Sequence, residues 1–119
     1  MHQQNKAIKN DCEFVFSHVS EKLNHLLGKT ILITGGTGFI GSWLSEVVHY
    51  LNESHNMGIN LFIVARDHNR FKSILPHISN SKNVKFIRSD IRNLTEVPIE
   101  VDYIIHAANS PDNRFHFSR

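Results

Sequence analysis

Residues 29–42 read KTILITGGTGFIGS, and this stretch decides the fold. Its first half is a short apolar and β-branched run, which is typical of a parallel strand covered on both faces. Its second half holds four of the chain's six glycines, and an amphipathic helix is expected to follow them directly. A strand, a glycine-rich turn and a helix in this order predict the first βαβ unit of an α/β sheet.

Gly35, Gly38 and Gly41 recur at three-residue steps, and each has a physical reason. The first permits a tight turn out of the strand, the second lets a pyrophosphate approach the backbone, and the third lets the helix pack closely on the sheet. The free N–H groups and positive dipole end of the helix favour phosphate there. No Gly-Lys-Ser/Thr follows, so the loop is not a P-loop.

Strands and helices alternate along the rest of the chain. Apolar runs predict further strands over residues 61–65, 84–88 and 101–107, which makes a parallel sheet of about four strands with right-handed crossovers. The helix after the glycines is predicted to bury a stripe of five apolar residues, Ile40, Leu44, Val47, Val48 and Leu51. Further helical spacing covers residues 69–78, where Pro76 leaves the helix end open, and residues 90–97 form a loop or short helix.

An amphipathic helix over residues 11–27 is predicted to precede the sheet. Its apolar face includes Phe14 and Val15, and Asn10 or Asp11 can cap its start. Gly28 stands where a C-terminal glycine of a helix belongs. Residues 1–10 are polar and are predicted to be frayed.

The composition excludes several classes of protein. The 119 residues are 40% hydrophobic with a formal net charge of +2, which is too apolar for a disordered tail and not basic enough for a nucleic-acid binder. One cysteine, Cys12, excludes an intramolecular disulfide and suits a reducing compartment. No 18-residue apolar run and no secretory signal are present, so neither a membrane span nor secretion is predicted, and the expected location is the cytoplasm.

Nine histidines invite a metal hypothesis, but none forms HxH, HExxH or a His-carboxylate cluster with ligand spacing. No metal site is therefore predicted.

Several motifs together resemble the extended short-chain dehydrogenase/reductase family, and more closely its NAD-dependent epimerase/dehydratase group, which acts on nucleotide sugars. They are ILITGGTGFIGS at residues 31–42, SDIR at residues 89–92 and DYIIHAA at residues 102–108, and the resemblance runs from about residue 11 to the end. It implies a Rossmann-type parallel sheet with flanking helices and a bound NAD(P) cofactor. The motifs are specific for the family and not for one reaction.

The resemblance also implies roles for single residues, all in cofactor binding. Asp90 would accept from the adenine amino group, and the backbone of Ile91 would meet the adenine ring. The pyrophosphate would lie on the glycine loop, at Gly35, Gly38 and Gly41, and would accept from the backbone N–H groups of Phe39 and Ile40. The nicotinamide ribose would lie beside the end of the fourth strand, at Ala107, Ala108 and Asn109.

Some of these residues have structural alternatives. Asp90 could be a turn residue only. Asp102 is expected to shape the turn into its strand rather than touch a ligand. His106 is either functional or a hydrogen-bonded histidine at a strand end. Trp43 and Tyr103 are expected to be packing residues.

The residues after the second strand bear on the choice of cofactor. NAD-binding Rossmann proteins usually hold an acid there that grips the ribose 2′-OH. Ala65 occupies that place, and Arg66 follows it, which favours the 2′-phosphate of NADP. Asp67, displaced by two residues, could instead reach the ribose. The family resemblance favours NAD, so both cofactors stay open.

The family's chemistry needs a Tyr-x-x-x-Lys pair, in which the tyrosine is a general acid/base. Only Tyr50 and Tyr103 are present, neither has a lysine four residues on, and Ser110 is too early to be the partner Ser/Thr. No catalytic residue is therefore assigned.

The chain is predicted to be a tail and helix over residues 1–28 and a partial dinucleotide-binding domain over residues 29–119, truncated before the catalytic pair and the substrate domain. It would be the cofactor-binding part of a nucleotide-sugar enzyme that is not competent alone and forms a homodimer, if at all, at full length. The alternatives are an NADP-dependent carbonyl reductase of the same superfamily and a non-catalytic dinucleotide-sensing module.

Overall fold

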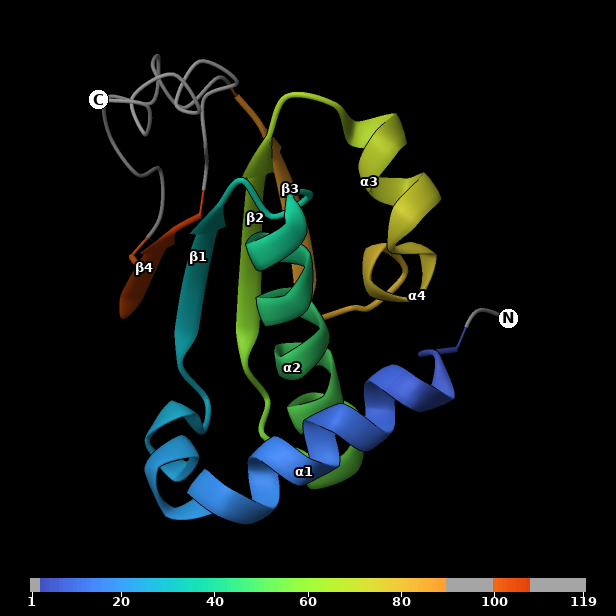
Figure 1. Cartoon of the computed structure of the whole chain (residues 1–119). Helices are drawn as coiled ribbons and strands as arrows, with labels where there is room; N and C mark the ends of the chain where they lie inside the picture. The colour runs from blue at the N-terminus through green and yellow to red at the C-terminus, as the bar shows by residue number, and fades with distance from the viewer. Residues whose placement is uncertain (1–2, 90–99, 108–119) are drawn as a thin grey trace, which may run out of the picture.

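The computed structural model describes residues 3–89 and 100–107, which form a four-stranded parallel sheet with helices against it (Figure 1). The strands are β1 (Thr30–Thr34), β2 (Asn60–Ala65), β3 (Val84–Arg88) and β4 (Tyr103–His106), in the spatial order β3-β2-β1-β4. All neighbours pair in parallel. The predicted α/β, Rossmann-type architecture is confirmed, with β4 shorter than the run of residues 101–107.

The strand order creates a switch point beside β1. The chain runs outward from β1 to β2 and β3, and then returns to place β4 on the other side of β1. Ligands of open α/β sheets bind outside the carboxyl ends of the strands at such a reversal. The edge formed by the ends of β1 and β4 is therefore the place to look for a site.

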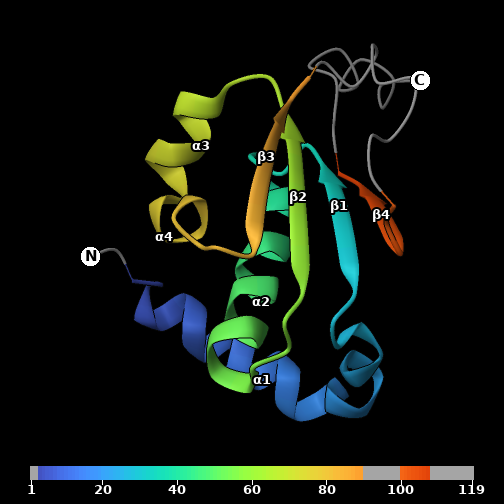
Figure 2. The same cartoon turned by 180° about the vertical axis from the view of Figure 1, so that it is seen from behind.

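Three helices cover one face of the sheet. They are α2 (Phe39–His55), α3 (His68–Ile74) and α4 (Pro76–Ser79), which lie in front of the strands in Figure 1. Figure 2 turns the opposite face to the viewer, and no helix of the described residues lies over it. The core between α2 and the sheet is fully buried at Ile33, Leu51 and Ile63.

The buried face of α2 differs from the predicted stripe, because Ile40 is 56% exposed. Gly41 and Ser45 are buried instead, and the Ser45 hydroxyl donates to the Gly41 carbonyl at 2.8 Å. The first turns of α2 lie so close to the β1–α2 loop that only small residues fit on the inner side. Hydrophobicity alone therefore pointed to the wrong face at the start of this helix, while Val48 and Leu51 are buried as predicted.

The first helix also departs from its prediction. α1 (Lys6–Leu23) begins five residues earlier than expected, because the side chain of Asn5 accepts hydrogen bonds from the N–H groups of Ala7 and Ile8. It ends four residues earlier and continues as a 3-10 turn at residues 24–26. Residues 6–10 are thus helical rather than frayed.

The face of α1 that packs on α2 is the one carrying Ile8, Cys12 and Phe16. The predicted apolar residues Phe14 and Val15 are 66% and 40% exposed. A kink at Val19, where φ is −132°, turns the last part of the helix. Two apolar stripes compete on this helix, and docking against α2 selects one of them.

The chain between β2 and β3 breaks at Leu75, whose φ of −130° lies outside the helix. Pro76 follows as the first residue of α4, where its missing N–H is not needed. The predicted interruption by Pro76 is therefore seen as two short helices. Trp43 packs against the core as expected, whereas Tyr103 is 43% exposed and is not a packing residue.

Candidate functional site

The turn that leaves β1 is tight and is held by backbone hydrogen bonds. Gly35 has a φ of +73°, a left-handed conformation that favours glycine. Its N–H donates to the carbonyl of Val64 in β2 at 2.9 Å, and its own carbonyl accepts from the N–H of Gly38 at 3.1 Å. The loop is thereby tied to the sheet at its first residue and closed on itself three residues later.

Two glycines of this loop leave no room for a side chain. A Cβ on Gly41 would overlap the Gly35 carbonyl and would lie 2.6 Å from the Cα of Gly36. A Cβ on Gly36 would overlap the Cγ2 of Ile63 in β2. The helix start therefore packs on the backbone of the loop, and the loop packs on the Ile63 side chain of the sheet.

Gly38 has different surroundings. A Cβ built on it would meet only the Gly35 carbonyl, at an ordinary 3.5 Å. Its φ of −77° suits any residue, so neither strain nor packing inside the protein requires a glycine there. The open space above Gly38 is compatible with close approach of a ligand to the backbone.

The N-terminus of α2 offers unpaired donors at this point. No side chain of the described residues caps it, whereas Asn5 caps α1 and Asp67 caps α3. The first N–H with a partner in the helix belongs to Ser42, which donates to the Gly38 carbonyl at 2.8 Å. Helix geometry leaves the preceding N–H groups, including those of Phe39 and Ile40, without intrahelical acceptors. Together with the helix dipole, they form an anion-binding end.

The side chains of Phe39 and Ile40 are 82% and 56% exposed. The predicted role of both residues uses only their backbone N–H groups. Their side chains point away from the core. They form an apolar rim at the start of α2.

β4 brings its end to the same edge of the sheet. The N–H of Ala107 donates to the Thr34 carbonyl at 2.9 Å, which places Ala107 directly beside the last residue of β1. The Thr34 hydroxyl and the His106 Nδ1 are 2.8 Å apart and share a hydrogen bond. Of the two alternatives for His106, the structure confirms a hydrogen-bonded histidine at a strand end. The ring also lies at the switch point, so a functional role stays a prediction.

Asp102 acts at the other end of β4. Its carboxylate accepts from the Thr30 N–H at 2.8 Å, and its own N–H donates to the Thr30 carbonyl at 2.9 Å. The expectation that Asp102 shapes the start of its strand is confirmed.

Arg66 follows β2 at the carboxyl edge, and its side chain is exposed. Asp67, the alternative ribose ligand, caps α3 by accepting from the Arg70 N–H at 3.0 Å. The predicted site residues Asp90, Ile91, Ala108 and Asn109 lie outside the described residues. The structure thus brings Gly35, Gly38, Gly41, Arg66 and Ala107 to one edge of the sheet.

A separate buried polar cluster joins α1, α2 and α4. Glu46 of α2 accepts a short hydrogen bond from His77 Nε2 and a second one, at 3.0 Å, from the Gln4 side-chain amide. Burial raises the pKa of Glu46, but the hydrogen bonds from His77 and Gln4 and the nearby imidazoles lower it, with a net pKa below the ordinary value. Burial and the charge of His77 lower the pKa of His49, which packs edge-on against the His77 ring.

This cluster holds helices together, and its central side chain, Glu46, is buried. Cys12 lies beside it, with its thiol 3.8 Å from the Glu46 carbonyl oxygen. Burial, and then the negative charges of Glu46 and Asp11, raise the pKa of Cys12 to about 11. Cys12 is therefore a poor nucleophile at neutral pH.

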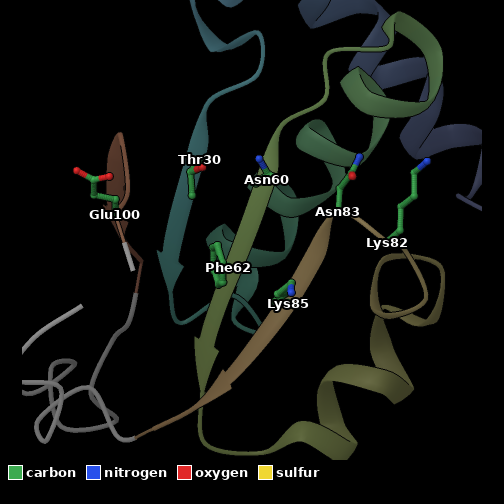
Figure 3. Close-up of a pocket in the computed structure, with 7 residues that line it drawn as sticks. All are labelled: Thr30, Asn60, Phe62, Lys82, Asn83, Lys85 and Glu100. Carbon is green, nitrogen blue, oxygen red and sulfur yellow. The ribbon is translucent and has the colours of Figure 1, made fainter. Parts of the chain in front are cut away.

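A shallow hollow of about 250 Å³ lies on the open face of the sheet (Figure 3). It is at the amino ends of the strands, opposite the glycine loop, and is lined by Thr30, Asn60, Phe62, Lys82, Asn83, Lys85 and Glu100. Its position separates it from the switch point, so it does not belong to the candidate site.

Within residues 3–89 and 100–107, no group of three or more His, Cys, Asp or Glu side chains is arranged to hold a metal ion. In the same part of the chain, no helix has both the length and the apolar character needed to cross a bilayer.

Sequence reasoning missed Gly36 and Thr34. Gly36 stands inside the glycine cluster, and its requirement follows from Ile63, which is 27 residues away. Thr34 was assigned to the strand alone, and its contact with His106 depends on β4 returning beside β1. Adjacency to the glycine motif was the only sequence signal for either residue.

The model of the NAD dependent epimerase/dehydratase family matches residues 31–119, which begin in β1 and include the whole glycine loop. No curated protein matches the sequence.

Proposed function

This chain belongs to the NAD dependent epimerase/dehydratase family, and on that premise we propose that its residue 35–41 loop binds the pyrophosphate of a nicotinamide dinucleotide. The observation that carries the proposal is the uncapped start of α2, which lies above a glycine turn at the switch point of the sheet. An anionic group there would accept hydrogen bonds from N–H groups that have no acceptor within the helix.

The fit of a dinucleotide rests on the loop itself. Gly38 leaves open space where a phosphate oxygen needs to approach, and Gly35 and Gly41 shape the turn. The N–H groups of Phe39 and Ile40 would donate to the pyrophosphate. The bound cofactor would supply hydride transfer, and the protein's part is to hold and orient it.

The two ends of the cofactor extend along the carboxyl edge in opposite directions. We place the adenosine beyond β2 and β3, near Arg66, Asp90 and Ile91. We place the nicotinamide ribose beyond β4, beside Ala107, Ala108 and Asn109. The strand order supports this assignment, because the glycine loop lies between these two groups of residues.

The reaction proposed for the complete enzyme is transient oxidation of a hydroxyl group on a nucleotide sugar. The Tyr-x-x-x-Lys pair that this chemistry needs does not occur in the 119 residues. We therefore propose that residues 29–119 bind the cofactor without turnover, and that residues 1–28 brace the domain from outside.

An NADP-dependent carbonyl reductase is the second candidate, and Arg66 favours it. The side chain of Arg66 is exposed after β2, where a 2′-phosphate would lie. Reduction of a simple carbonyl compound by the complete enzyme, with no activity on nucleotide sugars, would support this candidate.

Fluorescence titration with NADH and NADPH tests cofactor binding directly. We expect Gly38→Ala to weaken binding at least about tenfold, about 1.4 kcal/mol, because the added methyl group occupies the space of the pyrophosphate. Thermal unfolding of this variant should be unchanged, since the methyl group meets only ordinary contacts in the protein.

Ser54→Ala is the matched control, because Ser54 is exposed near the other end of α2. It should bind both cofactors like the unmodified chain. Binding of neither NADH nor NADPH by the folded chain would refute the proposed function.

A further inference from the structure

α1 lies outside the part of the chain that the family model matches. The match begins at residue 31, whereas α1 ends at Leu23. In Figures 1 and 2 this helix forms the lower border of the molecule and packs against α2, at the opposite end of the strands from the glycine loop. The proposed cofactor site therefore leaves the outer surface of α1 without a role.

The side of α1 that faces away from α2 exposes two neighbouring apolar side chains. Phe14 is 66% exposed and Val15 is 40% exposed. Docking uses the other side of the helix, where Cys12 belongs to the buried core and Phe16 packs on that core. Single exposed apolar residues are common, but neighbouring ones mark contact surfaces. This pair therefore indicates a surface that meets another molecule.

Asp11 and His18 flank the apolar pair, one helical turn away on either side. Asp11 precedes Phe14 and Val15 by three and four residues, and His18 follows them by four and three, so all four side chains lie on one side of the helix. All four are exposed, and the His18 ring lies against the Phe14 ring with 4.4 Å between centroids. We call these four residues the outer patch.

The two polar ends of the outer patch are chemically complementary. The Asp11 carboxylate forms no ion pair or side-chain hydrogen bond with residues 3–89 or 100–107. The Nδ1 of His18 is 2.8 Å from the Phe14 carbonyl oxygen, and because a carbonyl only accepts, Nδ1 donates there. The other ring nitrogen, Nε2, has no hydrogen-bond partner in the described part of the chain. In the imidazolium form it donates to a carboxylate.

The outer patch is complementary to itself in an antiparallel arrangement. Reversal of the helix direction exchanges Asp11 with His18 and leaves the spacing unchanged, with the apolar pair in the middle. We propose that two copies of this chain pair through α1, with each Asp11 carboxylate against His18 of the partner subunit and with the two apolar pairs in contact. A two-fold axis makes every such contact twice. A parallel pair would instead place Asp11 against Asp11, and like charges repel.

A second copy fits the outer patch better than a lipid surface does. Helices that lie on membranes carry Lys and Arg beside their apolar residues, whereas the first flanking residue here is the acidic Asp11. The outer patch is also small, and small interfaces belong to weak, transient complexes. The pairing is therefore concentration-dependent.

Sedimentation equilibrium of the whole 119-residue chain tests the pairing between about 1 and about 200 μM. We expect monomers at the low end of this range and mostly dimers at the high end. Phe14→Ser should raise the dimer dissociation constant at least about tenfold, because the central apolar residues of an interface carry most of its affinity. Monomers throughout the range, or an unchanged dissociation constant in Phe14→Ser, would overturn the proposal.

Leu27→Ser is the matched control. Leu27 is 60% exposed, close to the exposure of Phe14, but it lies beyond the end of α1 and outside the outer patch. It should leave the dissociation constant within about twofold, because residues outside an interface contribute little to its affinity. Equal losses in Leu27→Ser and Phe14→Ser would contradict pairing through α1, since they would show a general effect of apolar area.

Charge reversal tests the antiparallel orientation. Asp11→Lys should raise the dissociation constant at least about fivefold, because it places an ammonium beside the imidazole of the partner. The double variant Asp11→Lys with His18→Glu restores opposite charges and should return the dissociation constant to within about threefold of the unmodified chain. No recovery in the double variant would refute the arrangement, since a parallel pair gains nothing from the second change.

Two further measurements separate this proposal from its alternatives. A monomer that binds vesicles of phosphatidylcholine and phosphatidylserine, and no longer does so as Phe14→Ser, would assign the outer patch to a lipid surface and overturn pairing. NADH titration of Phe14→Ser should match that of the unmodified chain, because α1 lies away from the glycine loop. Failure of pairing therefore leaves the proposed cofactor site intact.

Discussion

Single glycines of the residue 35–41 loop are needed for different physical reasons. Gly35 is needed for its left-handed conformation, Gly36 because it lies against the Ile63 side chain, and Gly41 because it lies against the backbone of Gly35 and Gly36. Gly38 has no such requirement inside the protein. We therefore expect a substitution of Gly38 to affect ligand binding more than folding.

Replacement of Gly41 by alanine is expected to destabilise the protein by about 1–3 kcal/mol, the range seen for overpacked cores. The new Cβ would overlap backbone atoms of Gly35 and Gly36, and backbone cannot rotate away as a side chain can. Urea unfolding of Gly41→Ala and Gly38→Ala measures the difference. Equal stability of the two variants would show that the start of α2 does not pack on the loop as described.

At the scale of elements, a polar cluster fixes how α1, α2 and α4 meet. Glu46 of α2 accepts from His77 of α4 and from Gln4 just before α1. The side chains of Glu46 and His77 are buried and Gln4 is partly buried, and no buried side-chain polar atom of the described residues lacks a hydrogen-bond partner. Helix docking here depends on the ionised form of Glu46 and on a neutral His49.

Acidification should therefore loosen this contact in two steps. The pKa of His49 lies below its ordinary 6.5 in the folded protein, so the unfolded chain binds protons more readily and stability falls as the pH drops through about 6.5. The pKa of Glu46 lies below its ordinary 4.5, so a further loss begins below about that pH. Thermal unfolding between pH 8 and about pH 3 measures both losses.

Glu46→Gln provides the control for the second step. It should be less stable than the unmodified protein at neutral pH and should lose less stability below about pH 4.5, because the titrating carboxylate is gone. An unchanged slope in that range would assign the acid loss to other carboxylates.

At the scale of the whole molecule, strand order assembles the site. The glycine loop follows β1, Arg66 follows β2, Arg88 ends β3 and Ala107 follows β4. Because all four strands are parallel, these positions meet at one edge although they span more than 70 residues of sequence. A ligand lying along this edge contacts every strand and resists their separation.

Dinucleotide binding should accordingly raise the stability of the entire domain. At a free concentration of 100 times Kd, a ligand bound only by the folded state adds about 2.7 kcal/mol, which corresponds to a rise in Tm of about 10 °C for a domain of this size. Thermal unfolding with increasing NADPH measures it. Gly38→Ala should shift less at the same concentration, and an equal shift in that variant would place the ligand elsewhere.

Much of the architecture was predictable from local sequence. The strand segments around residues 30–34, 60–65 and 84–88 were predicted within one residue at each end, since continuous apolar and β-branched runs have few alternatives. The helix faces were less predictable. Ile40 in α2 and Phe14 in α1 are apolar and exposed, because small residues or a competing stripe face the partner element instead.

Short-range chemistry was enough to establish the strand–glycine–helix unit, the alternation of elements and the positions of the glycines, because each depends on neighbours within one or two turns of chain. Tertiary structure alone decided which glycines leave no room for a side chain, which face of each helix is buried, and that Arg88 stands beside Ala65. These features join residues such as Gly36 and Ile63 that are distant in sequence. The strand order β3-β2-β1-β4 brings such residues together, and no local pattern records it.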